Sequence, residues 1–143
     1  MTNCNSTSFS FSPLSGKRIT ASFTGGCITS NAGMLLLREM DKKINLTRTL
    51  SKAMIDKRAN SHIRHSHLSM LRQRIYSIAC GHEDLNDHDT LRSDLCIQTS
   101  VGKEEALASR STLSRFENNV TRADCLALAS VMIECKASMI TPC

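Results

Sequence analysis

The clearest helical pattern in the chain lies in residues 67–81, HLSMLRQRIYSIACG. The apolar residues of this stretch recur every three or four positions, so they fall on one face of an α-helix. That face consists of Leu68, Leu71, Ile75 and Ile78. Gly81 follows them and offers a natural end to the helix. The stretch therefore predicts an amphipathic helix with one buried face.

The composition favours a mainly α-helical fold. Hydrophobic residues make up 41% of the 143 residues, aromatic residues only 3%, and tryptophan is absent. The core must therefore be built from Leu, Ile, Met and Ala, a set that favours helices. Two prolines and six glycines provide few turns for an all-β fold. The length suits one domain with its own core.

Further helices are expected on both sides of residues 67–81. Residues 30–46, SNAGMLLLREMDKKINL, carry apolar side chains at helical spacing, with Ser30 or Asn31 as the N-cap. The apolar face would consist of Met34, Leu37, Met40 and Ile44. Shorter helices are predicted over residues 46–54, 104–108 and 111–118. Residues 122–139 are apolar around most of the circumference of a helix, so we expect burial on more than one side.

The N-terminal residues offer little that could be buried. Residues 1–17 are rich in Ser, Thr and Asn, which predicts a flexible tail. Residues 19–23, ITASF, alternate apolar and polar side chains, which predicts one short strand. The sequence offers this strand no convincing partner. We therefore expect a tail over residues 1–17 and a helical region over residues 18–140.

The charge of the chain permits a nucleic-acid partner. Lys and Arg number 18 against 13 Asp and Glu, which gives a net charge of +5. A basic surface can neutralise DNA phosphates, although a protein with an ordinary solvated surface can have the same net charge.

The seven cysteines are scattered and form no Cys-x-x-Cys pair. The sequence also shows no signal peptide and no membrane-spanning run, so a cytoplasmic protein with reduced thiols is expected.

Two clusters could hold a metal ion or act in catalysis. Carboxylates gather in residues 78–94, IACGHEDLNDHDTLRSD, namely at Glu83, Asp84, Asp87, Asp89 and Asp94. Paired carboxylates can bind Mg²⁺ or act as acid and base, but acids between two helices also cap helix ends, and we favour capping. Histidines occur at His62, His65 and His67, close to zinc-ligand spacing. A second tight ligand pair is missing, so we expect no metal site.

Residues 104–119, EEALASRSTLSRFENN, predict two short helices joined near Arg110. With Leu113 and Phe116 facing inward, a polar row would face outward. This row consists of Arg110, Ser114, Arg115 and Asn118. These side chains can contact phosphates and base edges. The segment SRSTLSRFEN is similar in sequence to the recognition helix of repressor-type helix-turn-helix proteins. The turn is shortened after Ala108, and a packing helix with a solvated basic face fits equally well.

Three segments, taken in order, resemble a known family. They are ITASFTGGCITSNAGMLLLREMDKKINL, RHSHLSMLRQRIYSIACGHEDLNDHDTLRSD and LASRSTLSRFENNV. Together they resemble the N-terminal region of bacterial insertion-sequence transposases of the thirteen-eighty group. The resemblance extends from about residue 19 to about residue 137. It implies a fragment of a larger α/β enzyme whose catalytic domain has an RNase H-like fold and an acidic, metal-binding triad.

The resemblance also implies that the catalytic domain is missing. In the family the first catalytic Asp lies on a strand after the helix that ends here near Met139, and the sequence stops at SMITPC. None of Asp84, Asp87 and Asp89 matches a member of the triad. We therefore expect no catalytic residue, no metal ligand and no cofactor in this chain, with Mg²⁺ held only by the missing domain. By itself the chain is expected to be catalytically inactive.

The implied function is DNA transposition, with the terminal repeats of the transposon as the bound DNA. The expected contacts are Arg110, Ser114, Arg115 and Asn118, together with Arg64, Arg72 and Arg74 as a second basic surface. Full-length transposase or a second copy of the chain is a further expected partner, and the expected location is the cytoplasm, on the nucleoid. Alternatives are a regulatory fragment, a relic without function, and a small metal-dependent enzyme.

Overall fold

The computed structural model describes residues 8–25, 28–58 and 63–140, and it confirms the expected mainly α-helical fold. The described part contains seven α-helices, a short 3-10 helix and a hairpin of two strands. The elements are β1 Phe9–Leu14, β2 Lys17–Ala21, α1 Gly33–Ile44, α2 Leu46–Ala53, α3 His67–Ala79, η2 Leu85–Asp87, α4 His88–Leu91, α5 Leu95–Val101, α6 Arg110–Asn118 and α7 Arg122–Ile140.

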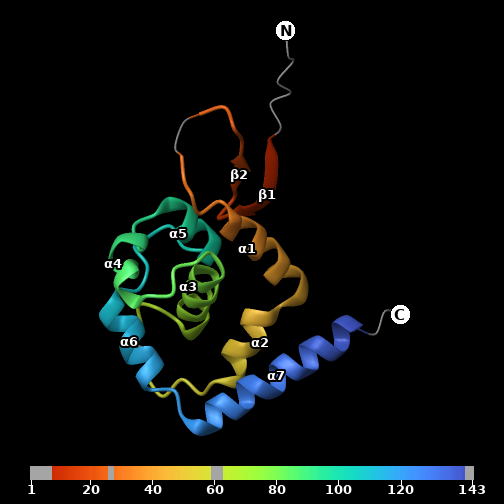
Figure 1. Cartoon of the computed structure of the whole chain (residues 1–143), viewed down its shortest axis with the longest axis vertical. Coiled ribbons are helices and arrows are strands. Elements are labelled where there is room, and N and C mark those ends of the chain that lie inside the picture. Colours follow the sequence, from red (N-terminus) through yellow and green to blue (C-terminus); the bar gives the residue numbers. More distant parts are fainter. Residues whose placement is uncertain (1–7, 26–27, 59–62, 141–143) are drawn as a thin grey trace.

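Helix α3, the helix predicted from residues 67–81, lies in the middle of the other helices (Figure 1). It contributes to two groups of buried apolar side chains. The first group joins α2, α3 and α6 and consists of Leu50, Met54, Met70, Leu71, Ala108, Leu113 and Phe116. The second joins α1, α3, α4 and α5 and consists of Met34, Tyr76, Leu91, Ile97, Val101 and Leu107. Ile75 packs against both groups, so α3 connects the two halves of the core.

The buried faces of α1 and α3 are wider and more polar than expected. In α3 the polar Gln73 and Ser77 are buried, whereas Ile78 is exposed. In α1, Met34 is buried as expected but Met40 and Ile44 are exposed. In α1 the polar Arg38 and Asp41 are buried instead, and their hydrogen bonds to Ser12 and Thr47 compensate the loss of water. Helix α1 also begins after Ala32, and neither Ser30 nor Asn31 caps it.

The expectation of a lone strand after a flexible tail is wrong. The strand spans Lys17–Ala21, and it pairs in antiparallel fashion with β1, which lies inside the segment expected to be a tail. The two strands meet through Ser15 and Gly16, whose φ angles are both positive, at 47° and 78°. Two successive residues with positive φ suit a tight hairpin connection. Arg38 of α1 holds the hairpin by donating to the carbonyl oxygens of Ser12 and Pro13, at 2.7 and 3.1 Å.

The helix expected over residues 104–108 does not form. These residues are irregular, and the preceding helix is instead α5, which the sequence pattern did not reveal. Helix α5 begins at the side chain of Asp94, which accepts a hydrogen bond from the N–H of Ile97 at 3.0 Å, and it ends at Gly102. The prediction of two short helices joined near Arg110 is therefore wrong for the first helix, and only the second forms, as α6. The helices predicted over 46–54, 111–118 and 122–139 are confirmed as α2, α6 and α7.

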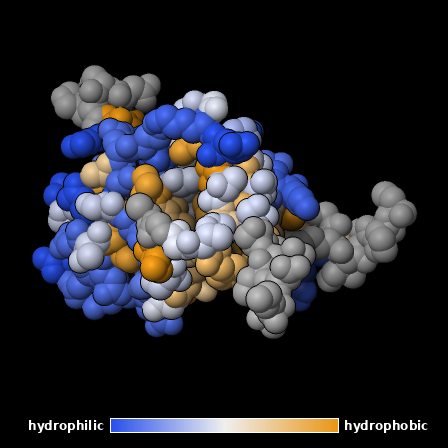
Figure 2. Space-filling model, turned by 90° about the horizontal axis from the view of Figure 1, so that it is seen from above, coloured by the Kyte–Doolittle hydropathy of each residue, from blue (hydrophilic) through white to orange (hydrophobic). Residues whose placement is uncertain are grey.

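Helix α7 runs along the outside of the molecule beside α2 (Figure 1). Leu128 and Val131 pack against the first core group, while Leu126, Met132 and Ile133 are exposed. The expected burial on more than one side is thus not observed. The face of the molecule seen from the hairpin end exposes hydrophobic surface as well, and this surface is surrounded by hydrophilic residues (Figure 2). Within the described residues, no helix is both long and apolar enough to cross a membrane.

Candidate nucleic-acid interface

Helix α6 presents its polar side to solvent in the predicted orientation. Leu113 and Phe116 are buried in the first core group, so the opposite face of the helix points outward. The outward row consists of Arg110, Ser114, Arg115 and Asn118. The two arginines and Asn118 are exposed, and Ser114 is half-buried and lies 3.3 Å from the side-chain nitrogen of Asn118. Helix α6 therefore offers hydrogen-bonding and cationic groups on one accessible face.

The acidic stretch supports the start of this helix. Asp89 accepts a hydrogen bond from the backbone N–H of Arg110 at 3.2 Å, and its carboxylate lies 3.6 Å from the guanidinium of the same residue. Arg110 also donates to the side-chain oxygen of Asn86 at 2.5 Å. An exposed ion pair of this kind contributes little stability, so Arg110 can exchange it for an external anion.

Capping is the role of two of the acids in residues 78–94. Asp84 begins η2 by accepting from the N–H of Asn86 at 2.8 Å, and Asp94 begins α5 in the same way. The hydrogen bond from the backbone of Asn86 is the main cause that lowers the pKa of Asp84. Among the residues that the structure describes, no three His, Cys, Asp or Glu side chains lie close enough to hold a metal ion. His62, one of the histidines considered, lies outside the described residues.

The expected second basic surface is not formed as a unit. The guanidinium of Arg72 turns toward α1 and α2, where it lies 3.3 Å from the carboxylate of Asp41 and donates to Thr47 at 3.1 Å. Arg74 instead pairs with Glu117 at 2.5 Å and donates to the carbonyl of Glu83. Both groups are partly buried and serve to hold helices together. Arg64, the third member, is exposed and lies apart from the other two, in a pocket near the N-terminus of α6.

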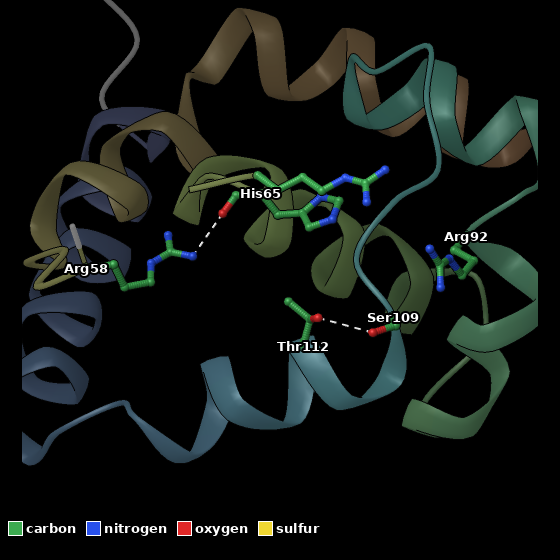
Figure 3. Close-up of a pocket in the computed structure, with 6 residues that line it drawn as sticks. Arg58, His65, Arg92, Ser109 and Thr112 are labelled. Atoms are coloured by element: carbon green, nitrogen blue, oxygen red, sulfur yellow. Dashed lines mark hydrogen bonds between the residues drawn. The ribbon is translucent and has the colours of Figure 1, made fainter. Parts of the chain in front are cut away.

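A basic pocket beside the N-terminus of α6 was missed by sequence reasoning. Its volume is about 290 Å³, and we call it the arginine pocket. It is lined by Arg58, Arg64, His65, Arg92, Ser109 and Thr112. Figure 3 shows His65 facing Ser109 and Thr112 across the pocket, with Arg58 and Arg92 at its two ends. These residues are scattered over more than 50 positions of sequence, so no local motif could reveal them.

The arginine pocket is electropositive. Arg58 is partly neutralised by two hydrogen bonds to Asp56, at 2.7 and 2.8 Å, and it also donates to the carbonyl of His65 at 3.0 Å. Arg64 and Arg92 form no ion pair with any described residue within 4.0 Å. Burial, followed by the nearby charges of Lys103 and Arg64, lowers the pKa of His65. The pocket therefore concentrates positive charge at which an anion would be stabilised.

The comparison with known families agrees with the resemblance noted in the sequence. A family model, described as Transposase DDE domain group 1, matches residues 11–141. This chain belongs to that transposase family. Membership implies a role in transposition and DNA as a partner. Neither a curated protein nor a solved structure matches the chain.

In this transposase-family chain, the position of α6 is set by a buried amide on α3. The side chain of Gln73 accepts from the N–H of Ala108 at 3.1 Å and donates to the carbonyl of Ala108 at 2.9 Å. Because both contacts fix the orientation of the amide, its nitrogen also donates to Nδ1 of His88 at 3.1 Å. Burial, followed by the charge of Arg74, lowers the pKa of His88, which disfavours the charged form of the ring. Gln73 thus attaches the segment before α6 to the centre of the transposase-family fold.

A second cavity continues from the arginine pocket along α6. Its volume is about 510 Å³, and it shares Arg58 and Thr112 with the arginine pocket. Arg115 of the outward row also lines it, while Phe116 and His67, whose ring centroids are 5.3 Å apart, provide part of its apolar wall. We call the two adjoining cavities of this transposase-family chain the furrow. Its charged lining is cationic in the arginine pocket and mixed in the second cavity, where Asp56 and Asp124 lie among Lys57, Arg58 and Arg115.

Proposed function

We propose that this chain acts in DNA transposition by binding DNA with the outward face of α6 and the furrow beside it. The observation that carries the proposal is the meeting of a polar, accessible helix face with a pocket whose lining includes three arginines and no carboxylate. Family membership supports it independently, because transposases act on DNA. The outward row would contact bases or phosphates, and the furrow would follow the DNA backbone.

Within this proposal, the bound DNA is the terminal repeat of an insertion sequence of the thirteen-eighty group. The three sequence segments that resemble that group support this choice.

We also propose that the catalytic triad is not supplied by residues 78–94. Asp84 and Asp94 are engaged in capping, and Asp89 accepts a hydrogen bond from the first residue of α6. Mg²⁺ would then be bound by carboxylates outside this stretch, and the chain would work on the nucleoid in the cytoplasm.

A gel-shift titration tests the DNA-binding proposal. The probe is duplex DNA with the terminal inverted repeat, compared with a scrambled duplex of the same length at about 150 mM salt, because ionic strength controls the non-specific term. We expect the repeat to bind at least about tenfold more tightly. The double substitution R115A/N118A should weaken binding to the repeat by about 1–3 kcal/mol per lost base contact.

Arg48 provides the matched control for this titration. It is an exposed arginine on α2 that lines neither cavity, so R48A removes the same charge without touching the furrow. We expect R48A to bind the repeat almost as tightly as the unchanged chain. Equal binding of repeat and scrambled DNA would exclude specific recognition. An equal loss in R48A and R115A/N118A would exclude the assignment to α6.

A further inference from the structure

We propose that the arginine pocket binds a single phosphate group of a DNA strand. This inference rests on the proposed DNA-binding function, and it assigns one of its contacts to a defined cavity. The pocket lining combines three guanidinium groups, one imidazole and two hydroxyl groups. All of these groups can donate hydrogen bonds to phosphate oxygens, and none of the lining side chains is an acid that would repel them.

The positive charge of the pocket is available to a ligand. Asp56 occupies part of the hydrogen-bonding capacity of Arg58. Glu105 lies 3.2 Å from the neighbouring Lys103, and its charge also acts on Arg64 and His65 from beyond ion-pair distance. Arg64 and Arg92 have no carboxylate within ion-pair distance in the described part of the chain. A guanidinium group can bind two phosphate oxygens at once, which an exposed lysine cannot do with the same geometry. Arg64 and Arg92 are therefore the residues that would hold the phosphate.

The N-terminus of α6 adds a second set of donors on the opposite wall. Ser109 occupies the N-cap position, yet its hydroxyl makes no capping bond to the helix. It lies instead 3.1 Å from the hydroxyl of Thr112 inside the pocket (Figure 3). Both hydroxyl groups can turn their hydrogens toward a bound anion. The dipole of α6, which is nine residues long, also favours negative charge at this end.

The size of the pocket limits the ligand to a small group. Sites that enclose drug-sized molecules measure about 300–1,000 Å³, and the arginine pocket is at the lower limit with about 290 Å³. A phosphate and part of its sugar fit this space, whereas a base pair does not. The bases of the strand would remain outside, where the second cavity and the outward row of α6 lie.

Titration of the 143-residue protein with inorganic phosphate tests the pocket directly. Calorimetry at constant ionic strength, with chloride as the compensating anion, should show saturable binding. The double substitution R64A/R92A should weaken it by about tenfold or more, the effect of one charge-assisted hydrogen bond. R48A should leave it unchanged. Should R64A/R92A fail to fold in a thermal melt, R64K/R92K keeps the charge but removes the bidentate fork, and a weakened affinity is still expected.

The imidazole of His65 gives a readout within the pocket. A bound phosphate places negative charge beside a ring that otherwise faces Arg64, Arg92, Lys103 and Glu105. NMR titration should therefore show that phosphate raises the pKa of His65 in the unchanged protein and has little effect on it in R64A/R92A. Non-saturable binding, or equal binding by R64A/R92A and the unchanged protein, would overturn the proposal.

Oligonucleotides then identify the source of the phosphate. Short single strands with and without a 5′-phosphate are added as competitors of inorganic phosphate. A clear preference for the 5′-phosphorylated strand assigns the pocket to a terminal phosphate, and equal competition assigns it to an internal phosphodiester. Lack of competition by both strands, with inorganic phosphate still bound, would reject DNA as the source. If the pocket binds phosphate but the chain gives no gel shift, the phosphate site stands while the proposed DNA-binding function fails.

Discussion

Asp41 of α1 is only 5% exposed, and its carboxylate joins three helices. It accepts hydrogen bonds from the backbone N–H of Thr47 on α2, at 2.8 Å, and from the hydroxyl of Tyr76 on α3, at 3.0 Å. The guanidinium of Arg72 on α3 lies 3.3 Å away. A buried carboxylate without such partners would be costly, so these four residues form one structural unit. Burial and the nearby carboxylate of Asp41 raise the pKa of Tyr76, which keeps its hydroxyl protonated as a donor.

His88 makes the stability of the protein depend on pH. Burial, and next the charge of Arg74, lower the pKa of this ring below its usual value of 6.5. The unfolded chain therefore binds a proton more readily than the folded chain, and acid favours unfolding. The contribution is fully present above about pH 6.5 and is lost as the pH falls toward the pKa of the folded state. His65 and His67, whose pKa values are also lowered, act in the same direction.

Urea denaturation at pH 7.5 and pH 5.5 measures this effect. We expect the free energy of unfolding to fall between the two pH values in the unchanged protein. H88Q should be less stable at pH 7.5, because it loses the fitted ring, but its stability should fall less over the same range. An identical pH dependence in the two proteins would show that His88 is not the titrating group.

At the scale of elements, short helices depend on their caps more than on their own propensity. Helix α5 has seven residues, too few for a stable helix in isolation, and it lies between the side chain of Asp94 and the left-handed Gly102 at φ 91°. Asp94 also accepts from the side chain of Asn31 at 3.2 Å, which ties α5 to the segment before α1. Helix α4, by contrast, starts at Asp87 without a side-chain capping bond.

This contrast gives a matched pair of substitutions. D94A should lower the free energy of unfolding by about 1–2 kcal/mol, since an N-cap and a hydrogen bond are lost. D87A removes the same charge at the start of α4, and we expect a change within about 0.5 kcal/mol, as for other exposed positions. Chemical denaturation of both variants checks the prediction. A larger loss in D87A than in D94A would contradict the capping role assigned to the acidic stretch.

At the scale of the whole molecule, the core is divided around α3 and the C-terminal helix lies at its edge. The first core group brings α6 against α2 and α3, so the outward row of α6 and the arginine pocket depend on that packing. Helix α7 contributes Leu128 and Val131 to this group, but Ile133 is 70% exposed. Apolar residues of α6 and α7 therefore differ greatly in their importance for folding.

A comparison of two apolar substitutions tests this division. Leu113 is completely buried in the first core group, and L113A should lower the free energy of unfolding by about 2–5 kcal/mol through lost burial and a cavity. I133S should change it by no more than about 0.5 kcal/mol. Thermal and urea denaturation provide both values. A loss in I133S as large as that in L113A would mean that α7 is buried in solution by contacts that the single chain does not show.

Sequence reasoning predicted the local features of this protein better than its contacts. The mainly α-helical class, helices α2, α3, α6 and α7, the stop at Gly81 and the inward side of α6 follow from apolar spacing and turn residues. The hairpin was missed because the partner strand, Phe9–Leu14, is short and lies in a serine-rich segment. Helix α5 was missed because its start and stop signals, Asp94 and Gly102, enclose only two turns of helix.

The sequence by itself determined the helical class, the position of α6 and membership of a transposase family, because these depend on patterns within short stretches. The tertiary structure alone decided which cations remain free. Arg72 and Arg74 are two positions apart, yet each is held by a carboxylate from a different helix. Arg64 and Arg92 instead meet at one pocket without such a partner among the described residues, beside Arg58, which Asp56 partly neutralises. The physical reason is that the free energy of a charged side chain depends on its neighbours in space, and these come from distant parts of the chain.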